Sequence, residues 1–395
     1  MKILVIHQVP YRKVEYHRAL DHHQHEITYA GSASMLARVP TDLPCTLMEI
    51  PQDEDVADTI IARTSRADGY DDVLSLSEFG ILLAHRVREH LALPGPCLQQ
   101  LEQVRDKVTM KQALEGSGIR VPRFVPHPPA CGPLPWSGRT VLKPRRGASS
   151  EGVSVYETAR EALAAYRKLQ DRLDYQLEEH IDGHILHTDA VVRDGSLTSL
   201  VTSRYVGKPV DFADGKPLGS HQLPHEPRHH AFAAQVVETL GITTGCVHLE
   251  FFETPDNDLV FLEIGNRVGG AGVITAHHRH TGVHLPSWEI AARLGLNPVP
   301  AQQPSGRYHG WLVLPGHHLP PGGDHNIAVP RRLREHPCMD RLHVLAPGTP
   351  LPTEITYQEW KTPVFVEASH HDSALLREFL EDCARSITVE GGTTL

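Results

Sequence analysis

Two lysines in the middle of the chain have the type and surroundings needed to bind a triphosphate. Lys143 ends a predicted strand and precedes a loop that contains Gly147, Ser149 and Ser150. Backbone N–H groups and hydroxyls of such a loop can bind phosphate oxygens, and a lysine ammonium is a compact charge suited to them. Lys107, on a helix expected just before this region, is a second candidate. For both lysines, a solvated surface position is the alternative interpretation.

Two glutamates, Glu250 and Glu263, are expected on opposite arms of a β-hairpin over residues 246–264. Carboxylate oxygens are ligands that Mg²⁺ accepts, usually together with substrate phosphates. The pair could therefore hold Mg²⁺, or Mn²⁺ in its place, with Asn266 as a further candidate ligand. Arg267 could neutralise charge on a transferring phosphoryl group or bind a substrate carboxylate. A cross-strand salt bridge is the structural alternative for each glutamate.

A third feature is the exit of the strand expected over residues 175–179. Its backbone can offer polar groups to the edge of an adenine while apolar neighbours enclose the ring. The candidate nucleotide-binding residues at this exit are Glu178, Glu179 and Ile181.

These segments, in this order, resemble the ATP-grasp superfamily over roughly residues 1–300. The motifs that carry the resemblance are Arg105-Asp106-Lys107, Val141-Leu142-Lys143-Pro144 with its glycine loop, residues 245–250 and residues 262–270. The resemblance implies a nucleotide held between two α+β lobes, with Lys107 and Lys143 on the phosphates and the two glutamates on the metal.

A narrower resemblance is to the amino-acid ligase branch, which includes bacterial dipeptide ligases and carnosine synthase. It is carried by His248, two residues before the first metal glutamate, and by Thr281-Gly282-Val283 at the end of a helix. It implies an ATP-dependent carboxylate–amine ligase that forms an amide bond through an acyl-phosphate and releases ADP and phosphate. The substrate contacts implied are Arg267, Gly269, Gly270, Ser203 and Arg204, the last two in an irregular loop over 203–223 that would close the site.

The sequence departs from the superfamily pattern at two positions. Gly265 stands where an asparagine metal ligand is usual, and Asn266 follows it. Ile185 stands where a glutamate usually binds the ribose, so His184 or His187 is the candidate ribose contact.

Strands alternating with helices predict an α/β and α+β fold. We expect an ATP-grasp fold with an open parallel α/β domain over 1–98, a small lobe over 99–180, a large lobe with the metal site over 181–300 and a C-terminal α+β subdomain over 301–395. A single helix is expected from about residue 99 to 115, ending at Gly116-Ser117-Gly118.

The bulk composition fits a cytoplasmic enzyme of small molecules. The formal net charge is -10 and no apolar stretch reaches membrane length, which argues against nucleic-acid and membrane partners. Six scattered cysteines, Cys131 among them, favour reduced thiols. Carboxylate and amine substrates are the expected partners, and a homodimer is left open. The 28 histidines, clustered at 22–25, 229–230 and 277–284, favour a histidine-rich surface over a metal site.

Three rival functions remain at this point. The chain could be an ATP-grasp carboxylase or a purine-pathway type of ligase, using bicarbonate or formate. It could also bind a nucleotide without catalysis. A Rossmann dehydrogenase is disfavoured because no G-x-G-x-x-G follows the first strand over residues 2–6.

Overall fold

The computed structural model describes residues 1–128, 132–320 and 325–391. Cys131 lies outside this part of the chain, and the five cysteines within it are free thiols. A search of the described helices found none with the length and apolar character that a membrane crossing requires.

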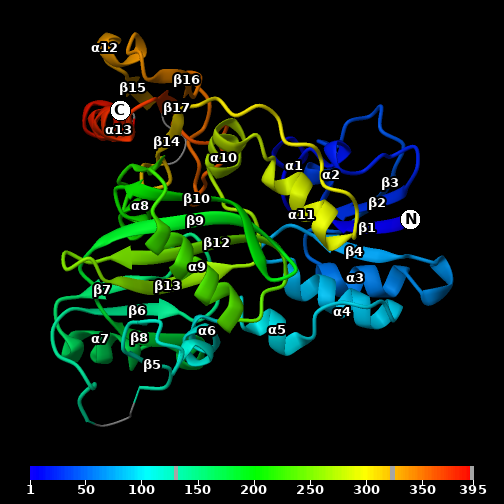
Figure 1. Ribbon diagram of the computed structural model, residues 1–395, viewed down its shortest axis with the longest axis horizontal. Coiled ribbons are helices and arrows are strands. Elements are labelled where there is room, and N and C mark those ends of the chain that lie inside the picture. Colours follow the sequence, from blue (N-terminus) through cyan, green and yellow to red (C-terminus); the bar gives the residue numbers. More distant parts are fainter. Residues whose placement is uncertain (129–131, 321–324, 392–395) are drawn as a thin grey trace.

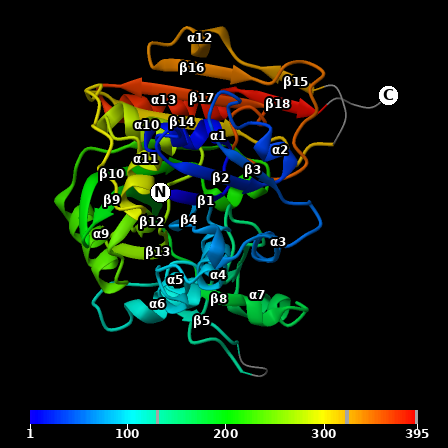
Figure 2. The ribbon, with the colours of Figure 1, turned by 90° about the vertical axis from the view of Figure 1, so that its right-hand side faces the viewer.

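The N-terminal domain is an open parallel sheet of strand order β3-β2-β1-β4, drawn in blue in Figures 1 and 2. Strand β1 is buried along most of its length because its Ile-Leu-Val-Ile run is covered on both faces, as parallel strands usually are. The prediction of an open parallel domain is confirmed. Its elements are β1 (Lys2–Ile6), α1 (Tyr11–Val14), β2 (Glu26–Gly31), α2 (Ala33–Leu36), β3 (Thr46–Glu49), α3 (Val56–Arg63), β4 (Asp72–Ser75) and α4 (Ile81–Leu91).

A second, small sheet has the order β5-β8-β6-β7 and is antiparallel throughout. Leu142 and Leu177 from its two central strands pack against one helix, α7. Its opposite face is left for the large sheet that follows. The elements are β5 (Phe124–Val125), β6 (Thr140–Pro144), β7 (Ser154–Tyr156), α7 (Ala159–Tyr166) and β8 (Tyr175–Glu179).

The third sheet has eight antiparallel strands in the order β13-β12-β9-β10-β11-β14-β17-β16. Strands from beyond residue 300 continue it without a break, so the C-terminal segment extends the sheet of the large lobe (Figure 1). Its strands are β9 (His184–Arg193), β10 (Ser196–Val206), β11 (Leu218–Gln222), β12 (Thr244–Glu253), β13 (Leu259–Gly265), β14 (Tyr308–Leu314), β16 (Met339–Val344) and β17 (Val364–His370).

Helices cover this sheet, and a two-stranded ribbon lies beside it. Helix α9 packs over one end, while α10, α11 and α13 pack against β14, β12 and β17. The remaining elements are α8 (Pro209–Ala213), α9 (Pro227–Thr239), α10 (Val273–Thr281), α11 (Leu285–Arg293), β15 (His325–Ala328), α12 (Arg331–Arg334), α13 (Ser373–Ser386) and β18 (Thr388–Gly391).

The single helix expected over 99–115 is two helices, α5 (Leu98–Glu102) and α6 (Lys107–Leu114). The break has a local cause, because the side chain of Asp106 accepts hydrogen bonds from the backbone N–H groups of Val108 and Thr109 at 2.9 and 3.1 Å. This N-cap starts a new helix and makes Lys107 its first residue.

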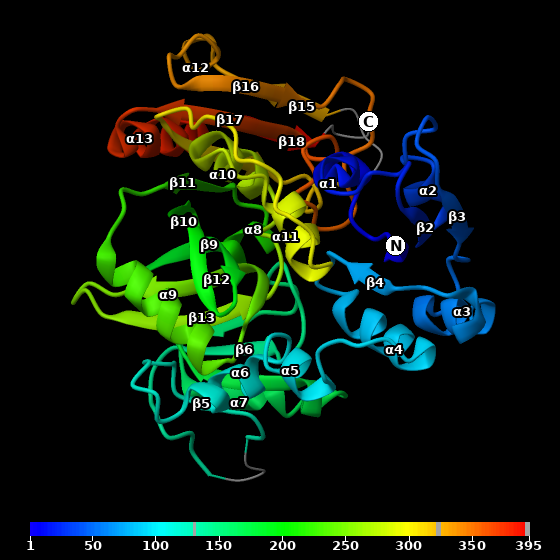
Figure 3. The same ribbon diagram turned by 45° about the vertical axis from the view of Figure 1, so that its right-hand side comes forward.

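Helix α6 lies between the small and large sheets (Figure 3). Met110 and Leu114 on one side of it pack into the apolar core formed by β12, β13 and α9. Lys111 on another side is fully buried and reaches Gln176 and Glu178 of β8. The helix therefore fixes the position of one sheet relative to the other.

Two expectations of the sequence analysis are wrong. The segment 203–223 is not irregular, because it consists mostly of the end of β10, helix α8 and strand β11. The histidine clusters do not all lie on the surface either. His22, His229, His277 and His284 are buried, and His229 and His277 lie on the covered faces of α9 and α10.

Replacing Asp106 tests the role of its carboxylate. Asp106→Ala should lower the free energy of unfolding by about 2–4 kcal/mol, because it removes a cap and the ion pair with Arg145 at 3.0 Å. Asp106→Asn keeps a capping oxygen and should cost only about 1–2 kcal/mol. Urea denaturation measures both values. Equal losses for the two variants would mean that the cap plays no part.

Candidate active site

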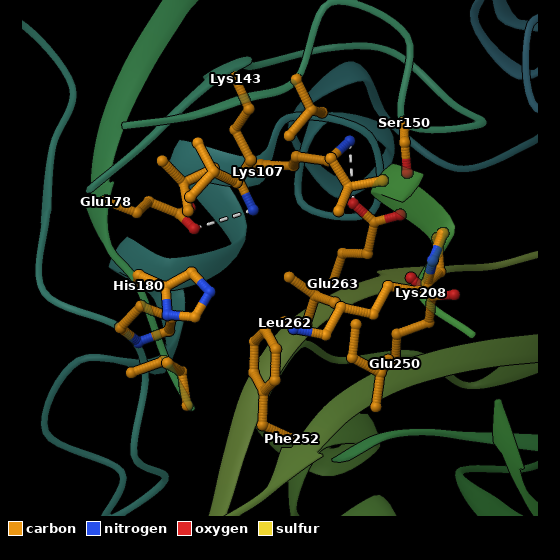
Figure 4. Close-up of a pocket in the computed structure, with 18 of the residues that line it drawn as sticks. Lys107, Lys143, Ser150, Glu178, His180, Lys208, Glu250, Phe252, Leu262 and Glu263 are labelled. Atoms are coloured by element: carbon orange, nitrogen blue, oxygen red, sulfur yellow. Dashed lines mark ion pairs between the residues drawn. The ribbon is translucent and has the colours of Figure 1, made fainter. Parts of the chain in front are cut away.

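Two adjoining cavities lie at the junction of the three sheets. The first, of about 980 Å³, is between the small sheet and the hairpin of β12 and β13 (Figure 4). The second, of about 1480 Å³, extends from there to the N-terminal domain. Residues that line both cavities include Lys107, Gly147, Ser150, Glu250 and Glu263. A ligand in one cavity would therefore share these groups with a ligand in the other.

The inner part of the first cavity is apolar. Val141, Val155 and Ile181 face it from the small sheet, and Phe252 and Leu262 face it from the large one. Arg123 donates a hydrogen bond of 2.6 Å to the carboxylate of Glu179. At this position the backbone of Glu179, rather than its side chain, is therefore the group that could contact a ligand. Flat apolar walls with backbone groups at one edge suit an aromatic ring.

The polar part of the first cavity includes Lys107, Lys143, Glu178, Glu250 and Glu263, and the buried Lys111 lies behind it. Lys143 Nζ lies 2.9 Å from Glu178 Oε2, and Lys111 binds the other oxygen of the same carboxylate. Burial lowers the pKa of Lys143 to about 8 and holds the pKa of Lys111 well below its usual value. Glu178 thus compensates two buried ammonium groups.

Lys107 makes the connection to the large sheet. Its Nζ lies 3.0 Å from Glu263 Oε2 and donates a hydrogen bond of 3.0 Å to the carbonyl of Gly147 (Figure 4). Because Gly147 opens the glycine loop, one ammonium joins the loop to the hairpin. Ser149 and Ser150 in that loop have φ values of 60° and 57°, in the left-handed region that side chains rarely adopt. Such strain is often found where a backbone is shaped for a ligand.

Glu250 and Glu263 are direct partners in the register of β12 and β13, so both carboxylates leave the hairpin at the same level. Tyr205 donates a hydrogen bond of 2.5 Å to Glu250, and His248 Nε2 lies 3.5 Å from the same oxygen. Burial alone would raise the pKa of Glu250, but the hydrogen bond and charge of His248 outweigh it and hold the pKa at about 2. Glu250 is therefore ionised at neutral pH.

His248 is itself held by a buried chain of polar groups. Asp189 binds His248 Nδ1 at 2.8 Å and His187 Nδ1 at 2.7 Å, and His187 Nε2 lies 2.7 Å from the hydroxyl of Ser220. Although burial lowers the pKa of His248, Asp189 raises it to about 9 overall. The three groups lie close enough to hold a metal ion, but Asp189 uses both oxygens to orient the two imidazoles.

The second cavity contains a glutamate between two arginines. Glu78 binds both Arg105 and Arg267, whose charges outweigh the effect of burial and hold the pKa of Glu78 at about 2. Arg267 keeps further N–H groups beside the cavity. Gly269 lies so close to the buried network that a Cβ there would be 2.5 Å from Asp189 Oδ1, which explains why glycine is needed.

Most predicted site residues line these two cavities. The first cavity receives Lys107, Lys143, Gly147, Ser150, Glu178, Glu179, Ile181, Glu250 and Glu263. The second receives Ser149, Arg267, Gly269 and Gly270.

Five predicted residues line neither cavity: Asn266, Arg204, His184, Ser203 and His187. Asn266 lies just beyond the end of β13, where its amide donates to the carbonyls of Cys246 and Thr244 at 2.9 and 3.2 Å, so the structure gives no support to its assignment as a metal ligand. Arg204 points away from its neighbour Tyr205 and contacts His184 at 2.8 Å, outside both cavities.

Ser203 and His187 line a separate small cavity and are not among the residues that line the first or the second. The ribose and substrate roles predicted for these residues are not supported.

Sequence reasoning missed several residues of the site. Lys111, which supports the first cavity from behind through Glu178, carried a signal, since it lies four residues after Lys107 and so on the same helix face. Glu78 carried another, because ligands of open parallel sheets bind beyond the carboxyl ends of the strands and β4 ends at Ser75. Tyr205, His180 and Lys208 are brought to the cavities only by the tertiary fold.

Comparisons with known proteins agree with this architecture. No family profile matches the chain. An alignment over 244 residues, which covers 58% of this chain and 58% of the length of the relative, shows 25% identity to the L-arginine-specific L-amino acid ligase of Bacillus subtilis. The solved structure of an L-amino acid ligase from Bacillus licheniformis is similar with a TM-score of 0.71 and 20% identity over 99% of both chains.

A third protein is similar in fold, the N5-carboxyaminoimidazole ribonucleotide synthetase of Thermotoga maritima, with a TM-score of 0.65 and 15% identity over 99% of both chains. These likenesses establish the fold. The chain has the ATP-grasp fold, as the sequence predicted.

Glu178 offers a test of the charge balance in the first cavity. Glu178→Gln should lower the free energy of unfolding by about 3–5 kcal/mol, because two buried ammonium groups lose their shared carboxylate. The adjacent Glu179→Gln is the control and should cost less than about 1 kcal/mol, since its partner Arg123 is largely exposed. Similar losses in chemical denaturation of the two variants would contradict this account.

Proposed function

We propose that this chain is an ATP-dependent carboxylate–amine ligase that forms an amide bond between amino acids or similar substrates. The observation that carries the proposal is the convergence of Lys107, Lys143, Glu250 and Glu263 on the boundary between a nucleotide-sized cavity and a larger one. The amino-acid ligase names of the Bacillus relatives support the same class of substrate.

The first cavity fits ATP. Its apolar inner part would hold the adenine, and Lys107, Lys143 and the loop of Gly147, Ser149 and Ser150 would bind the phosphates. The backbone near Ile181 would contact the edge of the ring.

The two opposed glutamates fit Mg²⁺, and also Mn²⁺, because both are ionisable oxygen donors at one level of the hairpin. A metal held there would neutralise charge on the phosphates. Glu250 and Glu263 would have to turn from their protein partners, Tyr205 and Lys107, toward the ion.

The reaction has two steps. A substrate carboxylate attacks the γ-phosphorus of ATP, the bond to ADP breaks, and an acyl-phosphate forms. An amine then attacks the acyl carbon, phosphate leaves with the bonding electrons, and the ammonium proton is lost to solvent or a base. Lys143 and Arg267 stabilise the charge on the transferring group, and the site contributes mainly by positioning.

Exclusion of water would protect the acyl-phosphate. Lys208, in the connection between β10 and α8, and Pro209, the first residue of α8, line the first cavity, and Pro209 also lines the second. We propose that this connection, together with the glycine loop, closes over the substrates.

The apolar lining of the second cavity favours this function over a carboxylase. Apolar side chains from Val9, Val14, Leu76, Ile274 and Pro286 line it beside Arg267. Bicarbonate has no apolar part to fill such a wall, whereas an amino-acid side chain has. The free thiols and the use of ATP are consistent with a cytoplasmic enzyme, and a homodimer stays a prediction.

A phosphate-release screen of amino-acid pairs, with bicarbonate and formate as further acids, tests the function. We expect release that depends on an amino-acid pair, with no release on bicarbonate or formate. Binding of ATP without turnover on any pair would favour the non-catalytic alternative.

Two variants test the assigned residues. Glu263→Gln and Lys143→Ala should each lower kcat/KM at least about 100-fold, because the first would lose a carboxylate that holds the metal ion and the second would lose a cation beside the transferring group. Asp258→Asn is the control, since it lies on the turn of the same hairpin and binds only the exposed Arg120. Full activity in either site variant would refute the assignment.

The pH dependence of ATP binding tests Lys143 separately. Affinity measured by calorimetry should fall as the pH rises from 7 to 9, because the ammonium, with its pKa near 8, loses the charge that attracts phosphate. Lys143→Arg stays charged and should show a flatter profile. An unchanged pH profile in that variant would assign the titration to another group.

A further inference from the structure

Five cationic side chains line the second cavity, and one of them differs from the others. They are Lys13, Arg105, Lys107, His248 and Arg267. Each of the last four binds a carboxylate of the protein: Arg105 and Arg267 bind Glu78, Lys107 binds Glu263, and His248 binds Asp189. Among the residues that the structure describes, Lys13 has no carboxylate within 4.0 Å.

Lys13 lies on α1 of the N-terminal domain, far in sequence from the rest of the site. Its Nζ donates a hydrogen bond of 3.0 Å to the carbonyl of Ala271, in the turn that directly follows Gly269 and Gly270. An ammonium group has three N–H donors, and the described residues provide one acceptor. The side chain is therefore held beside Arg267 and its glycines with donors to spare.

The groups around Lys13 leave it without an anionic partner of its own. The negative charge of Glu359 acts on Lys13 and raises its pKa, but the Glu359 carboxylate is itself paired with Arg341 at 3.2 Å and with Arg12 at 3.9 Å. The ring of Trp360 lies 6.0 Å from the ammonium. Burial lowers the pKa of Lys13 to about 8, so an anion in the cavity would offset a real desolvation cost.

We propose that Lys13 binds the free carboxylate of the amine substrate, so that this substrate is an α-amino acid rather than a simple amine or an amino-acid amide. The inference rests on the proposed ligase function and adds the residue that would recognise the second amino acid by its carboxylate. It assigns to the N-terminal domain a direct part in choosing that substrate.

The positions of the other charges indicate that Lys13 would bind the carboxylate of the amine substrate and not that of the acid substrate. The carboxylate of the acid substrate must reach the phosphoryl group near Glu250, Glu263 and Arg267, and it is consumed in the reaction. The carboxylate of the amine substrate persists in the product and needs a separate cation. Lys13 is the lining cation that no protein carboxylate neutralises in the described chain.

The test compares acceptors that differ only in this charge. Glycine, L-alanine, L-leucine and L-phenylalanine are assayed as amines beside their amides, with phosphate release as the readout. The wild type should prefer the free amino acids. Lys13→Met should raise KM for them roughly 10- to 100-fold while leaving KM for the amides and for the acid substrate unchanged.

Two further variants separate recognition from folding. Lys13→Arg keeps the charge and should recover part of the preference. Arg12→Met removes the adjacent exposed cation, which binds Glu359 at 3.9 Å and does not line the cavity, and should leave all KM values unchanged. An equal rise in KM for amino acids and for their amides in Lys13→Met would overturn the proposal. A rise in KM confined to the acid substrate would also overturn it.

A failure of the ligase function would be recognised separately. If the wild type releases no phosphate with any pair, calorimetric binding of L-leucine and L-leucinamide decides the inference alone. Binding of L-leucine that Lys13→Met abolishes, with leucinamide binding unaffected or absent, supports it. Equal affinities of the wild type for L-leucine and L-leucinamide, both unchanged in Lys13→Met, contradict the inference.

Discussion

The ion pair between Lys107 and Glu263 joins the two lobes of the site, and the rest of the arrangement depends on it. One partner begins α6 and the other lies on β13, 3.0 Å away. A charged pair in a half-buried cleft is costly to desolvate, and its two members are also the groups best suited to phosphate and metal. Without a ligand, the protein neutralises its own binding groups. A nucleotide carrying a metal ion would supply both charges at once and replace this pair.

Helix α6 converts this local pairing into a defined geometry. Its N-terminus is set by Asp106, its apolar side is fixed in the core of the large sheet, and Lys111 ties it to Glu178 of the small sheet. Because Glu178 also holds Lys143, a single carboxylate positions cations from two elements. The site is thus prepared by charges that compensate each other, and a change in one of them affects several.

Much of this site could be predicted from the sequence, because its motifs are local. The strand and loop around Lys143 and the hairpin with Glu250 and Glu263 depend on residues close in sequence, and the structure places them as expected. Asn266 follows the last residue of β13, and its amide is held by the carbonyls of Cys246 and Thr244, a placement that only the neighbouring strand reveals. Glu78 and Lys13 come from a separate domain, and only tertiary packing brings them to Arg267.

A crystal structure with ADP and Mn²⁺ would test the central claim most directly, because manganese can be located by its anomalous scattering. The account predicts one manganese between the carboxylates of Glu250 and Glu263, with the phosphates against Lys107 and Lys143 and the adenine between Val141 and Leu262. Manganese bound instead at His187, Asp189 and His248, or a nucleotide outside the first cavity, would contradict it.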